Sequence, residues 1–476
     1  MVFYIERCAF VVDMIRIFKV SIPGSTVVLL LSEALLVFSS YLVAAYVTLD
    51  IPADIYLLDD GGWRSIIFAG IFILFGLHFH DLYENYRIRS RAVLLQQFSL
   101  VLGIAFLLQA LLSYGHLRVL VLPTRIMVWG SALVLVLGPV WRILFTRVVW
   151  ESLGAEKLLF LGVSPAVREI VQRLRDRPEL RMTAIGFLDS EDRPKAFEGL
   201  PNLGTLSNLA DAVAQYRPDR IVVGMIERRG VLPIEQLLNL RFSRVRIEDS
   251  AATYETVFHR VPTRELRPSQ LIFSTNLGPH ESMVAMQSVY SWVLAVVILA
   301  VTLPVMLLVA LAVLLSSPGP ILYRQTRTGK DGIPFQLYKF RSMRQDAETG
   351  TGAVWATKDD PRVTAVGYWL RKLRLDELPQ LLNVIRGEMS LVGPRPERPE
   401  FVQVLQKEIP YYQQRLCVKP GITGWAQVNH KYGDTIDDAI TKLEYDLYYI
   451  KNLAPSLDAY IMFHTIKTVL LGRGAQ

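Results

Sequence analysis

Long apolar stretches dominate the first third of the chain. Four of them occupy roughly residues 25–48, 65–82, 94–114 and 126–147, and each is near the ~20 residues that cross a bilayer as a helix. The flanking segments alternate in charge, with basic residues before the first stretch, aspartates after it, and basic residues after the second and fourth. By the positive-inside rule, residues 1–150 are predicted to form four transmembrane helices with both ends in the cytoplasm.

Residues 156–275 contain shorter apolar segments that alternate with helical stretches. Strands are predicted at 157–162, 182–187 and 219–225. This alternation is typical of a doubly wound parallel sheet, which indicates a Rossmann-like domain. Its first strand–helix turn, 162–167, holds one glycine where a dinucleotide site needs several for close backbone approach. The domain is therefore interpreted as degenerate, and a scaffold role is favoured over nucleotide binding.

A fifth apolar run, 289–316, carries Pro304 near its centre and basic residues on both sides. Basic flanks favour a cytoplasmic location for both ends, and proline breaks the helical hydrogen-bond pattern. We therefore expect a re-entrant helix that enters one leaflet, breaks at Pro304 and returns, with Thr302 as a candidate partner for the freed backbone groups. The alternative is a kinked transmembrane helix, which would place residues 317–476 outside the cell.

Composition narrows the classes of partner. The chain is 51% hydrophobic and its mean hydropathy is positive, as expected for a membrane protein. The net charge of +7 fits a protein on an anionic cytoplasmic leaflet better than nucleic-acid binding, so no nucleic-acid partner is expected. Cys8 and Cys417 are far apart and form no CxxC pattern, which argues against a disulfide framework or a zinc site.

From Ser317 onward, arginines and lysines recur beside turn-forming glycines and prolines, a pattern suited to phosphate binding. The most distinctive feature is the adjacent acid pair Asp376 and Glu377. Neighbouring side chains on a helix point about 100° apart, so the two carboxylates suit different tasks. One can attack phosphorus while the other holds a cation. Taken alone, such a pair is more often the solvated first turn of a helix.

Five motifs, in order and spacing, resemble the catalytic domain of the polyprenyl glycosylphosphotransferases. These monotopic phosphoglycosyl transferases initiate bacterial exopolysaccharide and O-antigen synthesis. The motifs are KFRSM (339–343), LDELPQ (375–380), MSLVGPRPE (389–397), KPGITGWAQV (419–428) and YDLYYI (445–450).

The whole chain is similar to the large form of this family, which implies a membrane protein of α/β class. A four-helix transmembrane bundle at 1–150 would precede a degenerate Rossmann-like, CoA- or nucleotide-binding-like domain at 156–275. A monotopic, α-rich catalytic domain at 285–476 would follow, with a re-entrant helix at 289–316.

The resemblance implies transfer of a sugar-1-phosphate from a UDP-sugar to undecaprenyl phosphate by a ping-pong route. Asp376 would attack the β-phosphorus, release UMP and hold the sugar phosphate until the lipid phosphate attacks it. Glu377 would bind Mg²⁺. The other expected substrate-site residues are Lys339, Arg341, Arg374, Arg395 and, behind them, Asp446. Taken singly, each of these could equally form an intradomain salt bridge.

The resemblance also implies a multi-pass protein of the bacterial inner membrane, in contact with lipids, with its catalytic domain in the cytoplasm. A homodimer is left open. Ser288 and Ser291 stand where family members usually carry Arg and Asp, so an ion pair that anchors the re-entrant helix is in doubt. In the first span, Glu33 has no visible basic partner in the neighbouring spans, and we expect it to serve helix packing.

Two alternative functions stay open on the sequence. Membrane-bound nucleotide-sugar dehydratases or epimerases also pair four membrane helices with a degenerate domain. They need an intact glycine-rich fingerprint at the start of their catalytic domain, and none follows residue 275. A non-catalytic scaffold for polysaccharide assembly would require the acid pair to be inert. The identity of the sugar cannot be read from the sequence.

Overall fold

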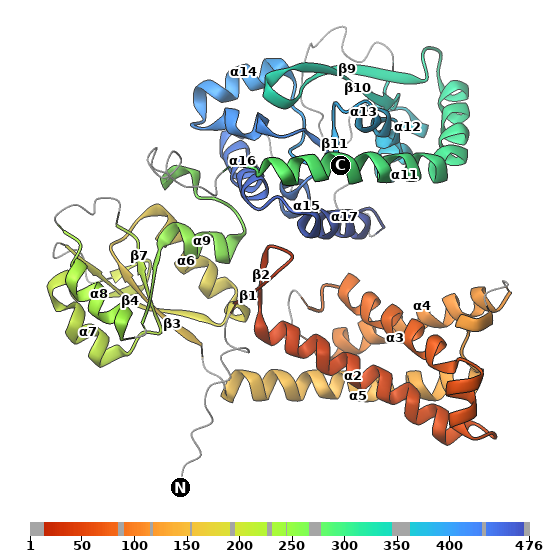
Figure 1. Ribbon diagram of the computed structural model, residues 1–476, viewed down its shortest axis with the longest axis horizontal. Helices are drawn as coiled ribbons and strands as arrows, with labels where there is room; N and C mark the ends of the chain where they lie inside the picture. Colours follow the sequence, from red (N-terminus) through yellow and green to blue (C-terminus); the bar gives the residue numbers. More distant parts are fainter. Residues whose placement is uncertain are drawn as a thin grey trace. The chain divides into compact units, whose positions relative to one another are not determined.

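The computed structural model describes residues 14–83, 90–114, 118–152, 155–190, 196–225, 231–243, 245–265, 278–344, 362–430 and 435–470. These residues form a mixed α/β protein, as predicted, and most of its elements are helices (Figure 1). The chain divides into two compact units. Phe18–Val20 and the chain from Asp249 belong to one unit, and the other residues up to Glu248 belong to the other.

Within the described residues, five helices are long and apolar enough to cross a membrane. They are α2 (Gly24–Thr48), α3 (Gly62–Phe79), α4 (Arg91–Tyr114), α5 (Thr124–Ser152) and α11 (Glu281–Ser316). The first four coincide with the four predicted spans and share one apolar core. Small residues let these helices approach closely, since a side chain at Gly130 would collide with the Tyr41 ring and one at Gly138 with Phe98.

A buried ion pair joins α2 to α5. Arg142 donates from both Nε and Nη2 to Glu33, with 2.8 Å between Nη2 and Oε2. The Tyr83 hydroxyl donates to the same carboxylate at 2.6 Å, and Arg142 Nη1 donates to the Leu82 carbonyl at 2.8 Å. The prediction that Glu33 lacks a basic partner in the neighbouring spans is therefore wrong. The arginine lies 109 residues away, and only the packing of α2 against α5 brings the two together.

A six-stranded sheet with the order β5-β6-β4-β3-β7-β8 follows the membrane helices along the chain. Its strands are β3 (Glu156–Leu161), β4 (Met182–Asp189), β5 (Ala196–Phe197), β6 (Leu200–Thr205), β7 (Arg220–Val223) and β8 (Arg246–Asp249). β3 pairs in parallel with β4 and β7, which confirms the predicted parallel sheet. The helices of this region are α6 (Pro165–Asp176), α7 (Leu209–Tyr216) and α8 (Ile234–Phe242). At the first turn, Gly162 has a φ of +76°, and Met225 occupies the space that a side chain there would need.

The second unit begins with α9 (Ser250–Phe258), which packs on α16 (Ile436–Lys451). Lys451 Nζ lies 2.8 Å from the Glu255 carboxylate, and the Val261 amide donates to the Glu444 carbonyl at 3.1 Å. The segment that leaves the sheet is thus part of the unit that carries the sequence motifs.

The other elements of this unit are short. They include β9 (Leu322–Thr328), β10 (Pro334–Phe340), α12 (Ala365–Lys372), the 3₁₀ helix η7 (Leu375–Gln380), α13 (Leu381–Ile385), β11 (Ser390–Val392), α14 (Pro399–Glu408), the 3₁₀ helix η8 (Tyr412–Cys417), β12 (Gly421–Thr423), α15 (Trp425–Asn429) and α17 (Pro455–Leu470). β9 and β10 form an antiparallel hairpin, and β11 pairs in parallel with β12.

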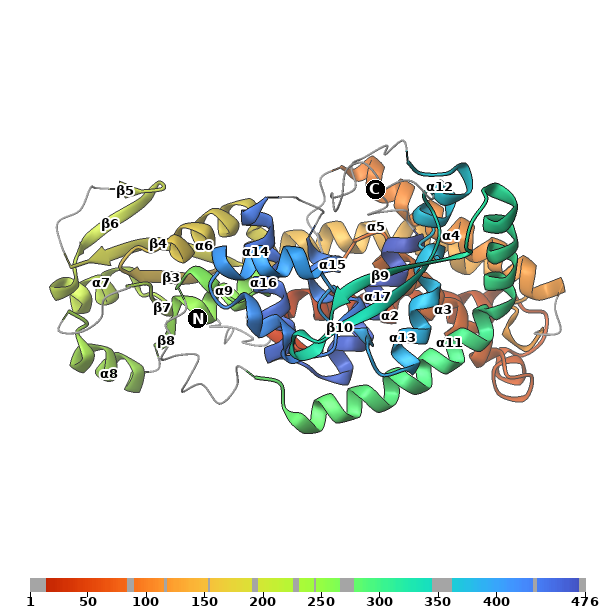
Figure 2. The same cartoon turned by 90° about the horizontal axis from the view of Figure 1, so that it is seen from above.

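Helix α11 contains Pro304 and changes direction within its length (Figure 1, Figure 2). Just before the proline, the Thr302 hydroxyl donates to the Ile298 carbonyl at 2.7 Å. Much of the helix surface is apolar and exposed, with Leu308 68% and Leu315 78% exposed. Such a surface is suited to lipid contact.

A polar network anchors the first half of α11 to the rest of the unit. Gln287 Nε2 donates to the Asp458 carboxylate at 2.7 Å and to the Tyr449 hydroxyl at 2.6 Å. The hydroxyls of Ser291 and Ser390 lie 2.9 Å apart, which ties the helix to β11. The anchor that the sequence left in doubt is therefore made of hydrogen bonds.

We predict that Glu33→Ala lowers the free energy of unfolding by about 3–5 kcal/mol, because Arg142 would stay buried without its counter-charge. The double variant Glu33→Leu with Arg142→Met should recover much of this loss, since no buried charge remains. Thermal unfolding of the three proteins in detergent micelles measures the effect. A Glu33→Ala protein as stable as the wild type would contradict it.

Candidate active site

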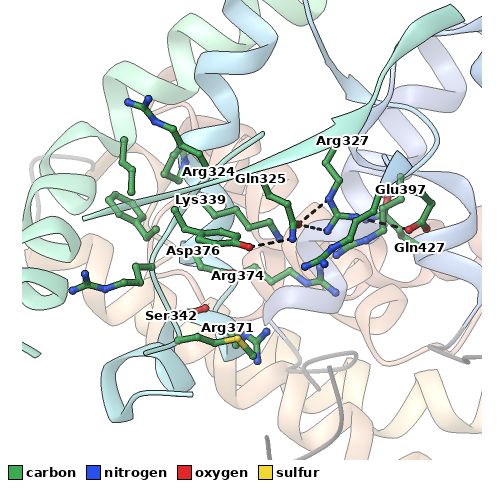
Figure 3. Close-up of a pocket in the computed structure, with 18 of the residues that line it drawn as sticks. Arg324, Gln325, Arg327, Lys339, Ser342, Arg371, Arg374, Asp376, Glu397 and Gln427 are labelled. Atoms are coloured by element: carbon green, nitrogen blue, oxygen red, sulfur yellow. Dashed lines mark hydrogen bonds and ion pairs between the residues drawn. The ribbon is translucent and has the colours of Figure 1, made fainter. Parts of the chain in front are cut away.

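A cavity of about 1150 Å³ lies within the second unit (Figure 3). Its walls come from α11, the β9–β10 hairpin, α12, η7, α13, the loop after β11, α14, η8, α15 and α16. Of the seven residues predicted for the site, six line this cavity: Lys339, Arg341, Arg374, Asp376, Arg395 and Asp446. The seventh, Glu377, contacts three of the six.

The acid pair lies on η7, and the local sequence explains how it is presented. Leu375 and Leu378 pack toward the apolar cluster around Val309 and Val313 of α11. Residues three apart share a face of a 3₁₀ helix, so both leucines point the same way and the two acids between them occupy other faces. Asp376 is 7% exposed and lines the cavity.

Three cations surround the Glu377 carboxylate. Lys339 Nζ lies 2.9 Å from Oε1, Arg374 Nη1 lies 3.5 Å from Oε2, and Arg395 Nη1 lies 3.8 Å from Oε1. Burial alone would raise the pKa of Glu377, but Lys339, Arg395 and Arg374 outweigh it and lower the pKa to about 2. Glu377 therefore stays ionised at neutral pH, and its negative charge attracts the side chains of all three cations.

The pKa of Asp376 is shifted in the opposite direction. Burial raises its pKa above the usual value, the charge of Lys339 opposes this, and the charge of Glu377 adds to it. In the part of the chain that the structure describes, no lysine or arginine forms an ion pair with the Asp376 carboxylate. The two neighbouring acids thus have different environments, as carboxylates with separate tasks require.

Asn383 on α13 fixes the strand that carries Lys339. Its Nδ2 donates to the Gln336 carbonyl at 2.7 Å, and its Oδ1 accepts from the Tyr338 amide at 3.1 Å. The residue is fully buried. The sequence analysis missed it, because an asparagine three residues after LDELPQ gives no signal of a contact with a strand about 45 residues earlier.

Asp446 pairs with Arg415, and through it supports Arg395. Arg415 Nη2 lies 2.8 Å from Asp446 Oδ2 and donates to the Arg395 carbonyl at 3.0 Å. Its Nη1 donates to the Tyr412 hydroxyl at 2.8 Å. Both charged side chains are nearly inaccessible to solvent. Arg415 was missed because it lies outside the five motifs.

Arg341 stands apart from the cations around Glu377. Its Nη2 donates to the Ser317 carbonyl at 2.6 Å and to the Ser317 hydroxyl at 3.0 Å. Its Nε and Nη1 are buried, and neither has a hydrogen-bond acceptor among the described residues.

A divalent cation is compatible with this donor set. The described residues contain no group of three or more His, Cys, Asp or Glu side chains able to hold a metal. Mg²⁺ at phosphate sites, however, uses one or two carboxylates and takes its remaining ligands from phosphate oxygens and water. Glu377, the predicted ligand, supplies a carboxylate of the required kind, so the residues fit Mg²⁺ bound together with a phosphorylated substrate.

Comparison with known proteins agrees with the family that the sequence motifs indicate. Residues 282–472 match the family described as bacterial sugar transferase. The UDP-N-acetylgalactosamine-undecaprenyl-phosphate N-acetylgalactosaminephosphotransferase of Aeromonas hydrophila is 50% identical over 182 residues, 38% of this chain and 43% of the relative. The UDP-glucose:undecaprenyl-phosphate glucose-1-phosphate transferase of Xanthomonas campestris pv. campestris is 32% identical over 327 residues, 67% of this chain and 68% of the relative.

The undecaprenyl-phosphate glucose phosphotransferase of Komagataeibacter xylinus is 32% identical over 329 residues, 67% of this chain and 60% of that protein. The matched region thus spans less than half of the Aeromonas relative, about two thirds of the Xanthomonas relative and less than two thirds of the Komagataeibacter relative. The similarity to the Xanthomonas and Komagataeibacter proteins extends well beyond the part of the chain matched by the family. The chain belongs to the bacterial sugar transferases, the polyprenyl glycosylphosphotransferase family.

Proposed function

We propose that this protein transfers a sugar-1-phosphate from a UDP-sugar to undecaprenyl phosphate and releases UMP, at the first membrane step of exopolysaccharide or O-antigen synthesis. The observation that carries the proposal is the cavity that holds Asp376 beside three cations and also reaches apolar residues of α11. Such a cavity offers a nucleophile, charge for a diphosphate and a wall for a lipid. The relatives' names supply the two substrate classes.

In the first step, a carboxylate oxygen of Asp376 forms a bond to the β-phosphorus of the UDP-sugar. The bond from that phosphorus to the bridging oxygen breaks, and UMP leaves with the electron pair. The product is an acyl phosphate that carries the sugar. Lys339, Arg374 and Arg395 lie where they can balance negative charge on the phosphate oxygens, and Glu377 keeps the three together.

In the second step, an oxygen of undecaprenyl phosphate attacks the same phosphorus. The bond to Asp376 breaks, the carboxylate is restored, and the sugar leaves as a diphosphate-linked lipid. Mg²⁺, held by Glu377 together with substrate phosphate, would add positive charge to the phosphate oxygens during both steps.

The proposed location is the bacterial inner membrane, with the catalytic unit on the cytoplasmic side, where UDP-sugars are found. A re-entrant α11 is supported by Pro304 within the helix, by its change of direction and by the exposed apolar surface on both sides of the proline. Basic residues before and after the apolar run favour a cytoplasmic position for both ends.

We predict that Asp376→Asn abolishes UMP release, because the amide cannot attack phosphorus. Wild-type protein trapped during turnover should carry a hexose-phosphate adduct on the LDELPQ peptide, detected by mass spectrometry under conditions that preserve acyl phosphates. Asp331→Asn is a matched control, since Asp331 is exposed, lies outside the cavity and has a positive φ that asparagine tolerates. Full activity of Asp376→Asn would refute the assignment.

Removal of Mg²⁺ should stop turnover, and Glu377→Gln should raise the Mg²⁺ concentration for half-maximal activity by roughly 10–100-fold, as for the loss of one supporting metal contact. Titration of Mg²⁺ into EDTA-treated protein measures both effects. Glu400→Gln, which changes an exposed acid outside the cavity, should titrate like the wild type. Undiminished turnover after thorough chelation would count against a metal at this site.

The rate of UMP release should fall in acid at a higher pH than an ordinary aspartate would give. The attacking form is the carboxylate, and burial raises its pKa, so the reactive fraction is lost as the pH falls through that raised value. Lys339→Met should move this acid limb upward by roughly one pH unit, because Lys339 lowers the pKa of Asp376. Glu377→Gln should move it downward. Profiles of the UMP-release rate against pH, each scaled to the variant's own maximum, test this prediction. Acid limbs at the same pH in all three proteins would contradict it.

A further inference from the structure

The hairpin of β9 and β10 runs along the cavity, so the positions of its residues give their order along the cavity. Phe340 pairs with Leu322 at the end next to α11, Lys339 pairs with Tyr323, and Phe335 pairs with Arg327 at the other end. At about 3.4 Å per residue, β9 covers roughly 17 Å between Leu322 and Arg327. Figure 3 shows Arg324, Gln325 and Arg327 on β9 along the cavity. The cavity therefore has two distinguishable ends.

The end next to α11 is apolar. Its lining includes Leu303, Met306, Leu307 and Ala310, which flank Pro304, together with Ile321 at the start of the hairpin. Leu303 and Leu307 are also 48% and 63% exposed, as side chains that face lipid would be. Of the two proposed substrates, only the polyprenyl phosphate carries a hydrocarbon chain that would bind such a wall.

Arg341 lies at this apolar end. Its backbone amide donates to the Ile321 carbonyl at 3.0 Å, and it directly follows Phe340, which packs with Val309 and Val313 of α11. The side chain is 7% exposed, and Nε and Nη1 have no acceptor within the described residues. Buried donors without an acceptor are unfavourable, and a phosphate that enters with a small shift of the side chain would satisfy both.

Arg371 brings a second guanidinium to the same end. It follows Leu370 on α12, which belongs to the apolar cluster with Phe340 and α11, and it lines the cavity. Asp376, the proposed nucleophile, lines the same cavity. A phosphate bound by Arg341 and Arg371 would thus sit between the membrane helix and the carboxylate that holds the adduct.

Other cations of the cavity form ion pairs with acidic residues. Lys339, Arg374 and Arg395 converge on Glu377. At the far end of the hairpin, Arg327 donates to Gln325 and lies 3.8 Å from Glu397. None of these contacts involves Arg341 or Arg371.

We infer that Arg341 and Arg371 bind the phosphate of the polyprenyl acceptor, whereas Lys339, Arg374 and Arg395 serve the diphosphate of the UDP-sugar. This inference rests on the proposed function. In the second step, the phosphate held by Arg341 and Arg371 supplies the oxygen that bonds to phosphorus as the Asp376 oxygen leaves.

The two half-reactions separate these roles in the full-length protein. The donor half is measured as the burst of UMP from UDP-glucose or UDP-N-acetylgalactosamine at stoichiometric enzyme, without lipid phosphate. The acceptor half is measured as steady-state transfer over a range of undecaprenyl phosphate concentrations. Arg341→Gln and Arg371→Gln should keep the UMP burst and raise the KM for undecaprenyl phosphate at least tenfold, whereas Arg395→Gln should lose the burst.

Lys372→Gln is the matched control, because Lys372 follows Arg371 but lies over the Trp369 ring, outside the cavity. Lys372→Gln should behave like the wild type. An equal rise in the KM for undecaprenyl phosphate in this control would mean that the arginine variants act through general attraction to the membrane, which contradicts the inference. An unchanged KM in both arginine variants, or an equal loss of both half-reactions, overturns the inference. If loss of the Ser317 contacts unfolds Arg341→Gln, Arg371→Gln carries the test. A wild-type protein that gives neither burst nor transfer with any member of a panel of UDP-sugars refutes the proposed function itself.

Discussion

The site depends on the charge balance between Glu377 and the three cations around it. Lys339, Arg374 and Arg395 would repel one another if they were brought together without a counter-charge. Glu377 stays ionised because their combined field lowers its pKa to about 2, although burial acts in the opposite direction. The same arrangement places two acids side by side without giving them the same protonation behaviour, because burial raises the pKa of Asp376.

Support for this balance comes from buried polar residues on neighbouring elements. Asn383 ties β10, and hence Lys339, to α13 through two backbone hydrogen bonds. On the other side, Arg415 is held by Asp446 and supports the backbone of Arg395. The leucines that flank the acid pair pack toward α11, so the position of the nucleophile is coupled to the position of the membrane helix.

The sequence did not predict the contacts between residues that lie far apart along the chain. Apolar run length located the five long apolar helices found among the described residues, and strand–helix alternation located the parallel sheet, because both signals are local. Four cations predicted from the motifs, Lys339, Arg341, Arg374 and Arg395, line one cavity. The partner of Glu33, the partner of Asp446 and the contacts of Asn383 were missed. In each case, the two residues are separated by at least 31 positions and meet only through tertiary packing.

The anchor of α11 shows why a missing ion pair need not weaken the fold. Asp458 is fully buried, and burial raises the pKa of this carboxyl, while hydrogen bonds from Tyr290, Gln287 and Tyr449 lower it. Replacing one member of a buried ion pair by a neutral donor reduces the Coulomb attraction, but it also removes the desolvation of a second charge, so the net change can be small. Because Ser390 on β11 bonds to Ser291, and β11 leads into the loop of Arg395, a hydrogen bond between two hydroxyls connects the membrane helix to the strand that precedes a cation of the site.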